Sequence, residues 1–139
     1  MLPKLQYHVE PEKGWLNDPN GLCYFNGKYH AFFQHYPNAT VWTAPLYWAH
    51  VTSDDLIHWE EQPMGLTPDQ PYESTGGCFS GSAFIKDARP ISSTLPWRRR
   101  CTDQCLATSE DGITLKSTRQ PHHRRTPRGP HRAGLPRPQ

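Results

Sequence analysis

The sequence predicts an all-β fold, and three observations carry that prediction. Short aromatic-rich segments recur about every dozen residues between Leu22 and Trp59, and turn-forming residues separate them. The dipeptide Asn26-Gly27 lies between two such segments, which is a strong signal for a β-hairpin. Helical periodicity is almost absent. We therefore expect an antiparallel sheet in the first half of the chain.

The expected elements follow in order along the chain. The predicted strands are 22–25, 28–34, 46–51, 79–85 and 105–109. The predicted turns are 52–55, 86–87 and 110–112. Residues 56–59 lead out of the first of these turns. Between the last two strands the pattern fails at Pro90, Pro96 and the run Arg98-Arg99-Arg100, and it does not return after Leu115. Trp48, inside a strand, is expected in the core.

Charge divides the chain into two unlike parts. The 139 residues carry a formal net charge of +2. Residues 1–115 hold eight basic and thirteen acidic residues, a net charge of −5, whereas residues 116–139 hold seven basic and no acidic residues, a net charge of +7. All 16 aromatic residues lie at or before Trp97, so the basic segment has no aromatic side chains for a core. We expect residues 116–139 to be a disordered tail.

Composition also argues against several classes of protein. No apolar run approaches the roughly 20 residues that span a bilayer, so we expect no membrane segment. Residues Met1–Lys4 are not followed by the apolar stretch of a secretory signal, so we expect a cytoplasmic protein with reduced thiols. Cys101 and Cys105 have no second pair at a zinc-ligand spacing. We expect no metal site and no cofactor.

One carboxylate stands among turn-forming residues just before the predicted hairpin. Asp18 lies within Trp15-Leu16-Asn17-Asp18-Pro19-Asn20-Gly21, where a strand end can hold a catalytic group facing a pocket. The alternative is an Asx turn, in which Asp18 or Asn17 caps its own backbone beside Pro19. Residues of the kinds that hold a sugar ring follow along the chain: Gln34, Trp42, Trp48, Phe79 and Ser80. Together with Asp18 they favour a carbohydrate pocket.

Five ordered motifs, which fall within residues 7–87, carry a resemblance to a known family. They are Trp15-Leu16-Asn17-Asp18-Pro19-Asn20-Gly21, Phe33-Gln34-His35-Tyr36-Pro37, Tyr47-Trp48-Ala49-His50, Asp55-Leu56-Ile57-His58-Trp59 and Cys78-Phe79-Ser80-Gly81-Ser82-Ala83. On these motifs the chain resembles the N-terminal part of glycoside hydrolase family 32, the group of invertases, sucrose-6-phosphate hydrolases and fructanases. The resemblance implies a five-bladed β-propeller followed by a β-sandwich. Residues 1–115 would cover the first blade and part of the second, without the sandwich.

The same resemblance implies a reaction and its residues. Asp18 matches the family's nucleophile, and the positions matched to the fructosyl site are Trp15, Leu16, Asn17, Gln34, Trp42, Phe79 and Ser80. A retaining glycosidase needs a second carboxyl group roughly 5–5.5 Å from the first. The chain contains neither the family's Arg-Asp-Pro motif, whose aspartate steadies the transition state, nor its Glu-Cys acid/base motif.

The implied function is hydrolysis of terminal β-D-fructofuranosyl bonds in sucrose, sucrose 6-phosphate or a fructan by a retaining double displacement. The partner is thus a small sugar, and this chain is expected to be inactive alone because the acid/base glutamate and the transition-state aspartate are missing. Two alternatives remain open: a non-catalytic sugar-binding fragment, and a fructosyltransferase that uses the same intermediate.

A shift of reading frame explains the basic tail. Read one nucleotide later, residues 131–139 permit Thr-Glu-Pro-Asp-Phe-Arg-Asp-Pro, which contains the missing Arg-Asp-Pro motif. Residues 120–123 shift to Asn-Pro-Ile-Ile, and a third frame through 91–95 permits Leu-Phe-Tyr-Thr. We hypothesise frame changes near residue 88, before Cys105 and near Leu115, which leave 88–104 and 116–139 out of frame. The rival, a basic nucleic-acid-binding arm, lacks aromatic residues for base stacking, so we expect no nucleic-acid partner.

Overall fold

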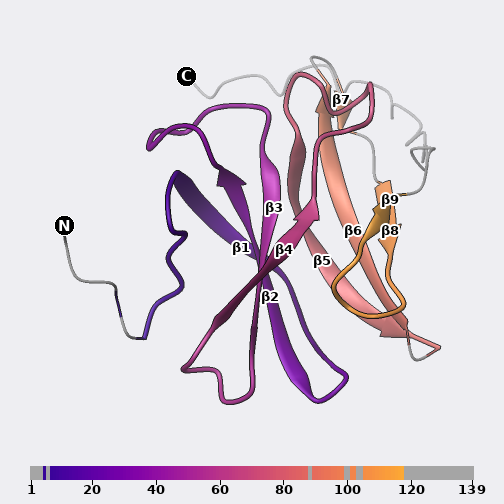
Figure 1. Ribbon diagram of the computed structural model, residues 1–139. Helices are drawn as coiled ribbons and strands as arrows, with labels where there is room; N and C mark the ends of the chain where they lie inside the picture. Colours follow the sequence, from indigo (N-terminus) through magenta and orange to yellow (C-terminus); the bar gives the residue numbers. More distant parts are fainter. Residues whose placement is uncertain (1–4, 6, 88, 99–100, 103–104, 118–139) are drawn as a thin grey trace, which may run out of the picture.

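The computed structural model describes residues 5, 7–87, 89–98, 101–102 and 105–117, and its strands form two antiparallel sheets that lie side by side (Figure 1). The first sheet has the order β1-β2-β3-β4, with strands at Trp15–Phe25, Lys28–Tyr36, Tyr47–Ser53 and Glu60–Leu66. The second has the order β5-β6-β8-β9, at Cys78–Lys86, Arg89–Arg98, Cys105–Thr108 and Lys116–Ser117, and β7 (Cys101–Thr102) pairs with β6. The described residues form no helix, which confirms the all-β prediction. Of the predicted tail, 116–139, residues 118–139 lie outside the described residues. Lys116–Ser117 forms β9 against β8, so the expectation that strands do not return after Leu115 is wrong at these two residues, because so short a strand leaves no pattern in the sequence.

The β1–β2 hairpin turns at Asn26-Gly27, as predicted. Both residues have positive φ, 50° and 80°, which a two-residue type I′ turn requires and which Asn and Gly tolerate best. The turn sets a register in which Phe25 pairs with Lys28 and, at the far end, Trp15 pairs with Tyr36. This register places the Asp18 motif opposite the end of β2.

Two strands of the first sheet differ from the prediction. β1 begins at Trp15 rather than at Leu22, so the segment expected to be a strand end is itself a strand, interrupted by two register shifts. The sequence pattern does not indicate β4, because Pro63 cannot donate to a ladder. β4 is an edge strand, and Pro63 falls where its register with β3 shifts, so the proline is tolerated.

The prediction that the strand pattern fails after Asp87 is wrong for the backbone. Arg89–Arg98 forms β6, between β5 and β8 in the second sheet. β6 pairs with β5 from Arg89 to Pro96 but with β8 only from Ile91 to Thr94. Pro90 and Pro96 lie outside that doubly paired stretch, so no ladder bond toward β8 is required of them.

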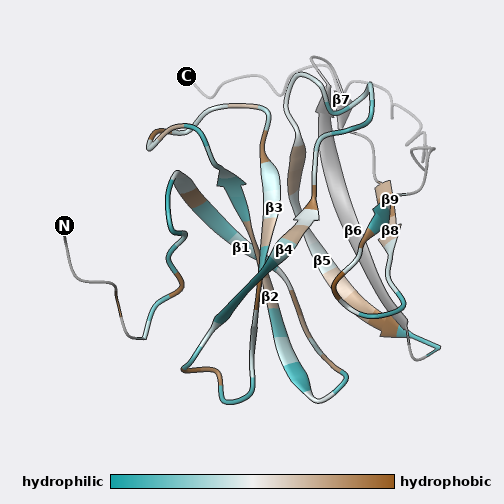
Figure 2. Ribbon diagram, in the orientation of Figure 1, coloured by the Kyte–Doolittle hydropathy of each residue, from teal (hydrophilic) through white to brown (hydrophobic). Residues whose placement is uncertain are grey.

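Alternation along β2 divides its side chains between two hydrophobic clusters. Phe32 faces the second sheet and joins a buried cluster drawn from both sheets: Phe32, Trp48, Leu66, Cys78 and Ala107. Ala31 and Phe33 point the other way and pack with Ala49 and Val51, covered by Val9, Leu16 and Trp59. Trp48 is fully buried, which confirms it as a core residue. Hydrophobic and hydrophilic residues are mixed along the strands of both sheets, as the colouring by hydropathy shows (Figure 2).

The turn after β3 is closed by its own side chains. Asp55 Oδ1 accepts hydrogen bonds from the backbone N–H groups of Ile57 at 2.9 Å and His58 at 2.7 Å. Ser53 Oγ accepts from the backbone N–H of Leu56 at 2.8 Å. Leu56 adopts a left-handed conformation, with φ of 65°, although it is not glycine.

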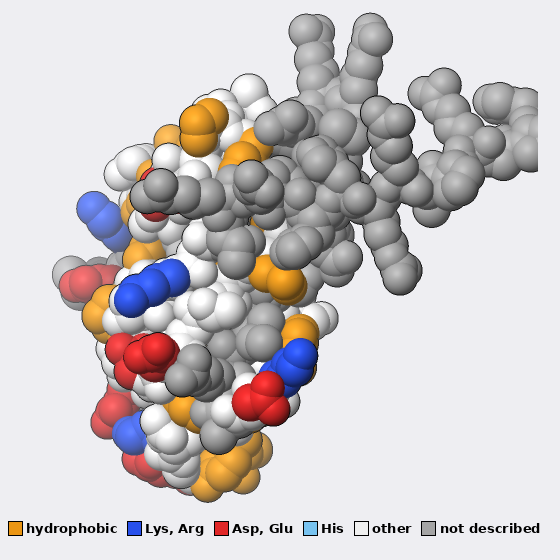
Figure 3. Space-filling view, turned by 90° about the vertical axis from the view of Figure 1, so that its right-hand side faces the viewer, with side chains coloured by type: hydrophobic (Ala, Val, Ile, Leu, Met, Phe, Trp, Pro, Cys, Tyr) orange, Lys and Arg blue, Asp and Glu red, His pale blue; other side chains and the backbone are white. Residues whose placement is uncertain are grey.

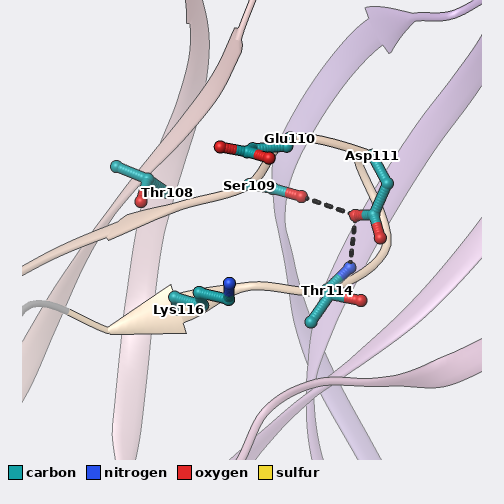
Figure 4. A pocket seen from close by; sticks show the side chains of 6 residues that line it. All are labelled: Thr108, Ser109, Glu110, Asp111, Thr114 and Lys116. Atoms are coloured by element: carbon teal, nitrogen blue, oxygen red, sulfur yellow. Dashed lines mark hydrogen bonds between the residues drawn. The ribbon is translucent and has the colours of Figure 1, made fainter.

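The turn after β8 repeats this construction in the second sheet (Figure 4). Asp111 Oδ1 accepts from the N–H groups of Ile113 at 2.8 Å and Thr114 at 2.7 Å, and Ser109 Oγ accepts from Gly112 N at 2.9 Å. Gly112, at the place of Leu56, has φ of 80°. The pattern Ser-x-Asp-x-Ile thus occurs once in each sheet, and each copy ends a strand with the same hydrogen bonds.

On the side seen in Figure 3, hydrophobic side chains lie in separate groups among acidic and basic ones. Among the described residues, no helix is long and apolar enough to cross a membrane.

Candidate active site

A row of polar and aromatic side chains crosses the first sheet on the side that faces the second. Asn17 of β1 pairs with Gln34 of β2, and Gln34 pairs with Trp48 of β3. Residues directly opposite one another in antiparallel strands share a face. Gln34 and Trp48 are buried, and Asn17 is half-buried.

Two members of this row fasten the second sheet to the first. Gln34 Nε2 donates to the backbone carbonyl of Cys78 at 3.4 Å, and Trp48 Nε1 donates to the carbonyl of Phe79 at 3.1 Å. Both acceptors lie at the start of β5, so the side chains of the first sheet fix where β5 begins. Ser80, the next residue of β5, is thereby held beside the first residues of β1.

A second clamp holds the same end of β5 from the β2–β3 loop. Leu46 N donates to Gly76 O at 3.1 Å, and Cys78 N donates to Leu46 O at 2.8 Å. Gly77, between them, has φ of +87°, and a Cβ there would overlap the backbone of Leu46. Only glycine fits this close approach of two backbones.

Asp18 lies at an irregularity of β1. The register with β2 shifts between Asn17 and Pro19, and Asp18 has φ of 27°. Strict alternation would turn its side chain to the face of Leu16, away from the second sheet, and the bulge breaks that alternation. The buried side chain of Asn20 holds the bulge, because its Nδ2 donates to the backbone carbonyl of Asp18 at 2.9 Å.

The carboxylate of Asp18 reaches across to the second sheet. Ser80 Oγ donates to Asp18 Oδ2 at 2.7 Å, and Asp18 remains exposed. Asn17 Oδ1 accepts a hydrogen bond from Trp15 Nε1 at 2.7 Å, and Asn17 Nδ2 donates to Gln34 Oε1 at 2.7 Å. The side-chain bonds of Asp18 and Asn17 thus favour the site interpretation over the Asx turn.

The structure gathers most, but not all, of the predicted site residues. Trp15, Asn17 and Gln34 form one hydrogen-bonded group, Asp18 and Ser80 form a second next to it, and Phe79 contributes its backbone carbonyl to the same region.

Leu16 points to the opposite face of the first sheet, where it packs against the cluster of Ala31 and Phe33. Its predicted place in the site therefore does not involve its side chain, because alternation along β1 separates it from Asn17. Trp42 lies in the β2–β3 loop with 54% of its surface exposed, outside the hydrogen-bonded group.

Asn20 is the residue of this site that sequence reasoning missed. It stands inside the motif that carries Asp18, but its role depends on a side-chain bond to a backbone carbonyl two residues earlier. The run Asp-Pro-Asn-Gly is a turn signal, and such signals mark residues whose side chains bond the local backbone.

Two histidines on the inner face of the first sheet belong to the core rather than to the site. His30 Nδ1 lies 3.0 Å from His50 Nε2, and the His50 ring stacks on Phe32 with centroids 4.1 Å apart. Because the Phe25 carbonyl can only accept, His30 Nε2 donates to it, at 3.2 Å, and Nδ1 accepts from His50. Burial lowers the pKa of both rings, for His50 to about 4, and the nearby His30 adds to the shift. Both are therefore neutral near pH 7.

The hollow at the β8–β9 turn is not part of this site. It is lined by Thr108, Ser109, Glu110, Asp111, Thr114 and Lys116 (Figure 4). Asp111 accepts hydrogen bonds from within its own turn, which hold its pKa well below the usual range. A carboxylate so engaged stabilises the turn.

Comparison with known proteins adds a family context. Residues 8–132 match the family described as "Glycosyl hydrolases family 32 N-terminal domain". The raffinose invertase of Escherichia coli is 45% identical over 121 residues, which cover 79% of this chain and 25% of that protein. The sucrose-6-phosphate hydrolase of Lactobacillus gasseri superposes with a TM-score of 0.78 at 30% identity, covering 85% of this chain and 25% of that one.

A third relative was solved with a sugar. The fructofuranosidase of Schwanniomyces occidentalis, complexed with fructose, superposes with a TM-score of 0.73 at 36% identity, over 81% of this chain and 25% of that one. These relatives are five-bladed β-propeller enzymes, so the all-β strands described above form the N-terminal part of such a propeller. The chain spans about a quarter of the length of the relatives it matches.

Proposed function

This chain belongs to glycoside hydrolase family 32, and from that premise we propose that Asp18 is the nucleophile of a retaining β-fructofuranosidase. One observation carries the proposal: the exposed Asp18 carboxylate is turned out of β1 by a bulge and held by Ser80 of the other sheet. The substrate class is a sugar with a terminal β-fructofuranosyl group, such as sucrose or sucrose 6-phosphate. The names of the relatives support this class.

The first chemical step forms one bond and breaks one. An Asp18 carboxylate oxygen attacks the anomeric carbon of the fructosyl group, and the bond from that carbon to the glycosidic oxygen breaks with its electron pair. The departing oxygen takes a proton from a general acid. Water, with its proton removed by the same group, then attacks the fructosyl ester and releases fructose. Ser80 donates to Asp18 Oδ2, which orients the carboxylate for the attack.

This chain supplies the nucleophile and lacks the acid motif, so we expect it not to hydrolyse sucrose at an enzyme-like rate. A poor leaving group such as a sugar alkoxide depends on protonation, whereas an activated leaving group does not. The non-catalytic alternative, a chain that only binds sugar, would give a calorimetric binding signal with fructose or sucrose but no covalent product.

An activated substrate tests the nucleophile alone. With β-D-fructofuranosyl fluoride, the carbon–fluorine bond breaks and fluoride leaves without protonation, so Asp18 forms the fructosyl ester in the absence of an acid. Without a general base the ester hydrolyses slowly and accumulates. Intact-mass spectrometry then shows one added fructosyl group, and peptide mapping places it on Asp18.

Two variants control this test. Asp18→Asn is expected to abolish the adduct. Asp54, at the β3–β4 turn, is a carboxylate that pairs with Lys28 away from the site, and Asp54→Asn is expected to leave the adduct unchanged. An adduct on another residue, or an equal adduct in Asp18→Asn, refutes Asp18 as nucleophile. Rapid fructose release from sucrose by the purified chain refutes its proposed inactivity.

The boundaries and location of the chain belong to the same proposal. Residues 1–115 form the propeller part, with 88–104 and 116–139 translated out of frame, in a cytoplasmic protein without a nucleic-acid partner. The charge of +7 and the lack of aromatic residues in 116–139 support the frame hypothesis. Sequencing of the gene on both sides of codon 115 tests it, and a gene without the alternative codons refutes it.

A further inference from the structure

Three hydrogen bonds form a chain with one direction through the candidate site. Trp15 Nε1 donates to Asn17 Oδ1 at 2.7 Å, Asn17 Nδ2 donates to Gln34 Oε1 at 2.7 Å, and Gln34 Nε2 donates to the Cys78 carbonyl at 3.4 Å. The chain starts on β1, crosses β2 and ends on β5, so it runs from one sheet to the other.

The two ends of this chain fix its direction. An indole N–H can only donate a hydrogen bond, and a backbone carbonyl can only accept one. Rotating the Asn17 amide by half a turn would place its N–H groups against the indole N–H and its oxygen against Gln34 Oε1. Rotating both amides would restore the bond between them, but would set Asn17 Nδ2 against the indole and Gln34 Oε1 against the Cys78 carbonyl. Each alternative leaves like groups facing each other in a partly buried place.

We propose that Trp15 is a positioning residue whose indole N–H orients the side-chain amides of Asn17 and Gln34. Its role is thus distinct from stacking on a sugar. Each amide nitrogen carries two hydrogens and uses one in the chain. The orientation therefore sets which way the second N–H of each amide points. Gln34 is buried, whereas Asn17 is half-buried and adjacent to Asp18 in the chain, so the Asn17 amide is the one available beside the carboxylate.

This arrangement has a consequence for sugar recognition, which rests on the proposed function. The Asp18 carboxylate accepts hydrogen bonds, and the oriented amides donate them. A sugar hydroxyl can do both, so a hydroxyl placed between them donates to the carboxylate and accepts from an amide. If the amides were free to rotate, half of their orientations would present an oxygen to that hydroxyl instead.

The test removes one hydrogen-bond donor and keeps the ring. Trp15 is replaced by 3-benzothienylalanine, in which sulfur takes the place of the indole N–H. Side-chain amide signals of Asn17 and Gln34 are followed by nuclear magnetic resonance in the sugar-free chain. We expect both amides of the unmodified chain to show slow hydrogen exchange and fixed contacts, and both to lose them in the analogue.

Two variants separate orientation from general stability. Trp59→Phe removes an indole that packs on the opposite face of the first sheet, so it lowers the unfolding midpoint without changing the two amides. Trp15→Phe repeats the loss of the donor with a natural residue. Unchanged amide exchange and contacts in the benzothienyl analogue overturn the proposal, as does an equal loss in Trp59→Phe.

A kinetic measurement connects the amides to the site. The rate of Asp18 capture by β-D-fructofuranosyl fluoride is expected to fall by up to about 100-fold in the analogue, because misplaced binding groups misorient the reacting carbon. The resonance experiment uses no sugar, so it stands or fails separately from the nucleophile. An unchanged capture rate with disordered amides refutes the role in recognition.

Discussion

The two Ser-x-Asp-x-Ile turns allow the same substitution to be made in opposite directions. Leu56 and Gly112 occupy equivalent positions and both have left-handed φ, 65° and 80°. An L-residue in this conformation costs roughly 1–2 kcal/mol relative to the right-handed region, and glycine avoids that cost. We predict that Gly112→Ala strongly destabilises the chain, whereas Leu56→Gly changes its stability little.

The neighbours of the two positions set the magnitudes. A Cβ on Gly112 would lie 2.8 Å from Phe25 Cδ1 and 3.0 Å from His30 Cε1, so crowding adds about 1–3 kcal/mol to the backbone cost. The stiffer unfolded chain returns about 0.4–1 kcal/mol. The net loss for Gly112→Ala is therefore about 1–4.5 kcal/mol, with a midpoint near 3 kcal/mol.

For Leu56→Gly the contributions nearly cancel. The relief of the left-handed conformation, about 1–2 kcal/mol, is offset by a more flexible unfolded chain and by the loss of a side chain that is already 54% exposed. We expect a net change within about 1 kcal/mol of zero.

Urea denaturation followed by tryptophan fluorescence measures both variants, with the slope against urea required to stay constant. A Leu56→Gly variant as unstable as Gly112→Ala would refute the reasoning, because the left-handed φ would then carry no cost. A Gly112→Ala variant equal to the parent would show that Phe25 and His30 do not crowd the turn.

Three further predictions concern pH. The hydrogen bond from His58 to Asp55, with the backbone N–H groups of the turn, holds the pKa of Asp55 well below its usual 3.8. This stabilisation is present above pH 3.8 and is lost as the pH falls below it. In Asp55→Asn the free energy of unfolding therefore falls less steeply on acidification. Burial raises the pKa of Glu73 above its usual 4.5, so its carboxyl destabilises the fold as the pH rises beyond 4.5. Thermal unfolding at pH 5 and pH 8 is expected to show that Glu73→Gln is more stable than the parent chain chiefly at pH 8. Burial lowers the pKa of His50 from 6.5 to about 4, so stability falls as the pH drops from 6.5 to 4; His50→Gln, measured by urea titrations across that range, loses this slope.

The sequence specified the hairpin and the strand class because both depend on local chemistry. Asn26-Gly27 is compatible with few turns besides type I′, and the register of β1 and β2 follows from it. Pro90 and Pro96 misled the prediction of β6, and β4 was not predicted, because the effect of a proline depends on which neighbour a strand has, and sequence does not state the neighbour. Pro63 lies on an edge strand, and Pro90 lies beyond the end of β8.

The candidate site was predicted as a set of residues but not as a set of contacts. The motifs identify Asp18, Gln34 and Ser80, whereas the bulge at Asp18 and the bond from Asn20 depend on the register between β1 and β2. Leu16 shows the limit of motif transfer most clearly. It is adjacent in sequence to Asn17, and the pleat sends its side chain to the opposite cluster.

The contact between Asp18 and Ser80 makes the site depend on the second sheet. β1 alone presents a carboxylate at a bulge, and Ser80 orients it only because β5 is held in place. On one side β5 is fastened through Gln34 and Trp48, which belong to the well-matched motifs. On its other side it pairs with β6, residues 89–98, the segment that the frame hypothesis treats as mistranslated. If that hypothesis is right, restoring the frame changes the strand that borders Ser80 while leaving the residues that bond Asp18 untouched. The Ser80 contact with Asp18 therefore depends on both neighbours of β5, the first sheet on one side and β6 on the other.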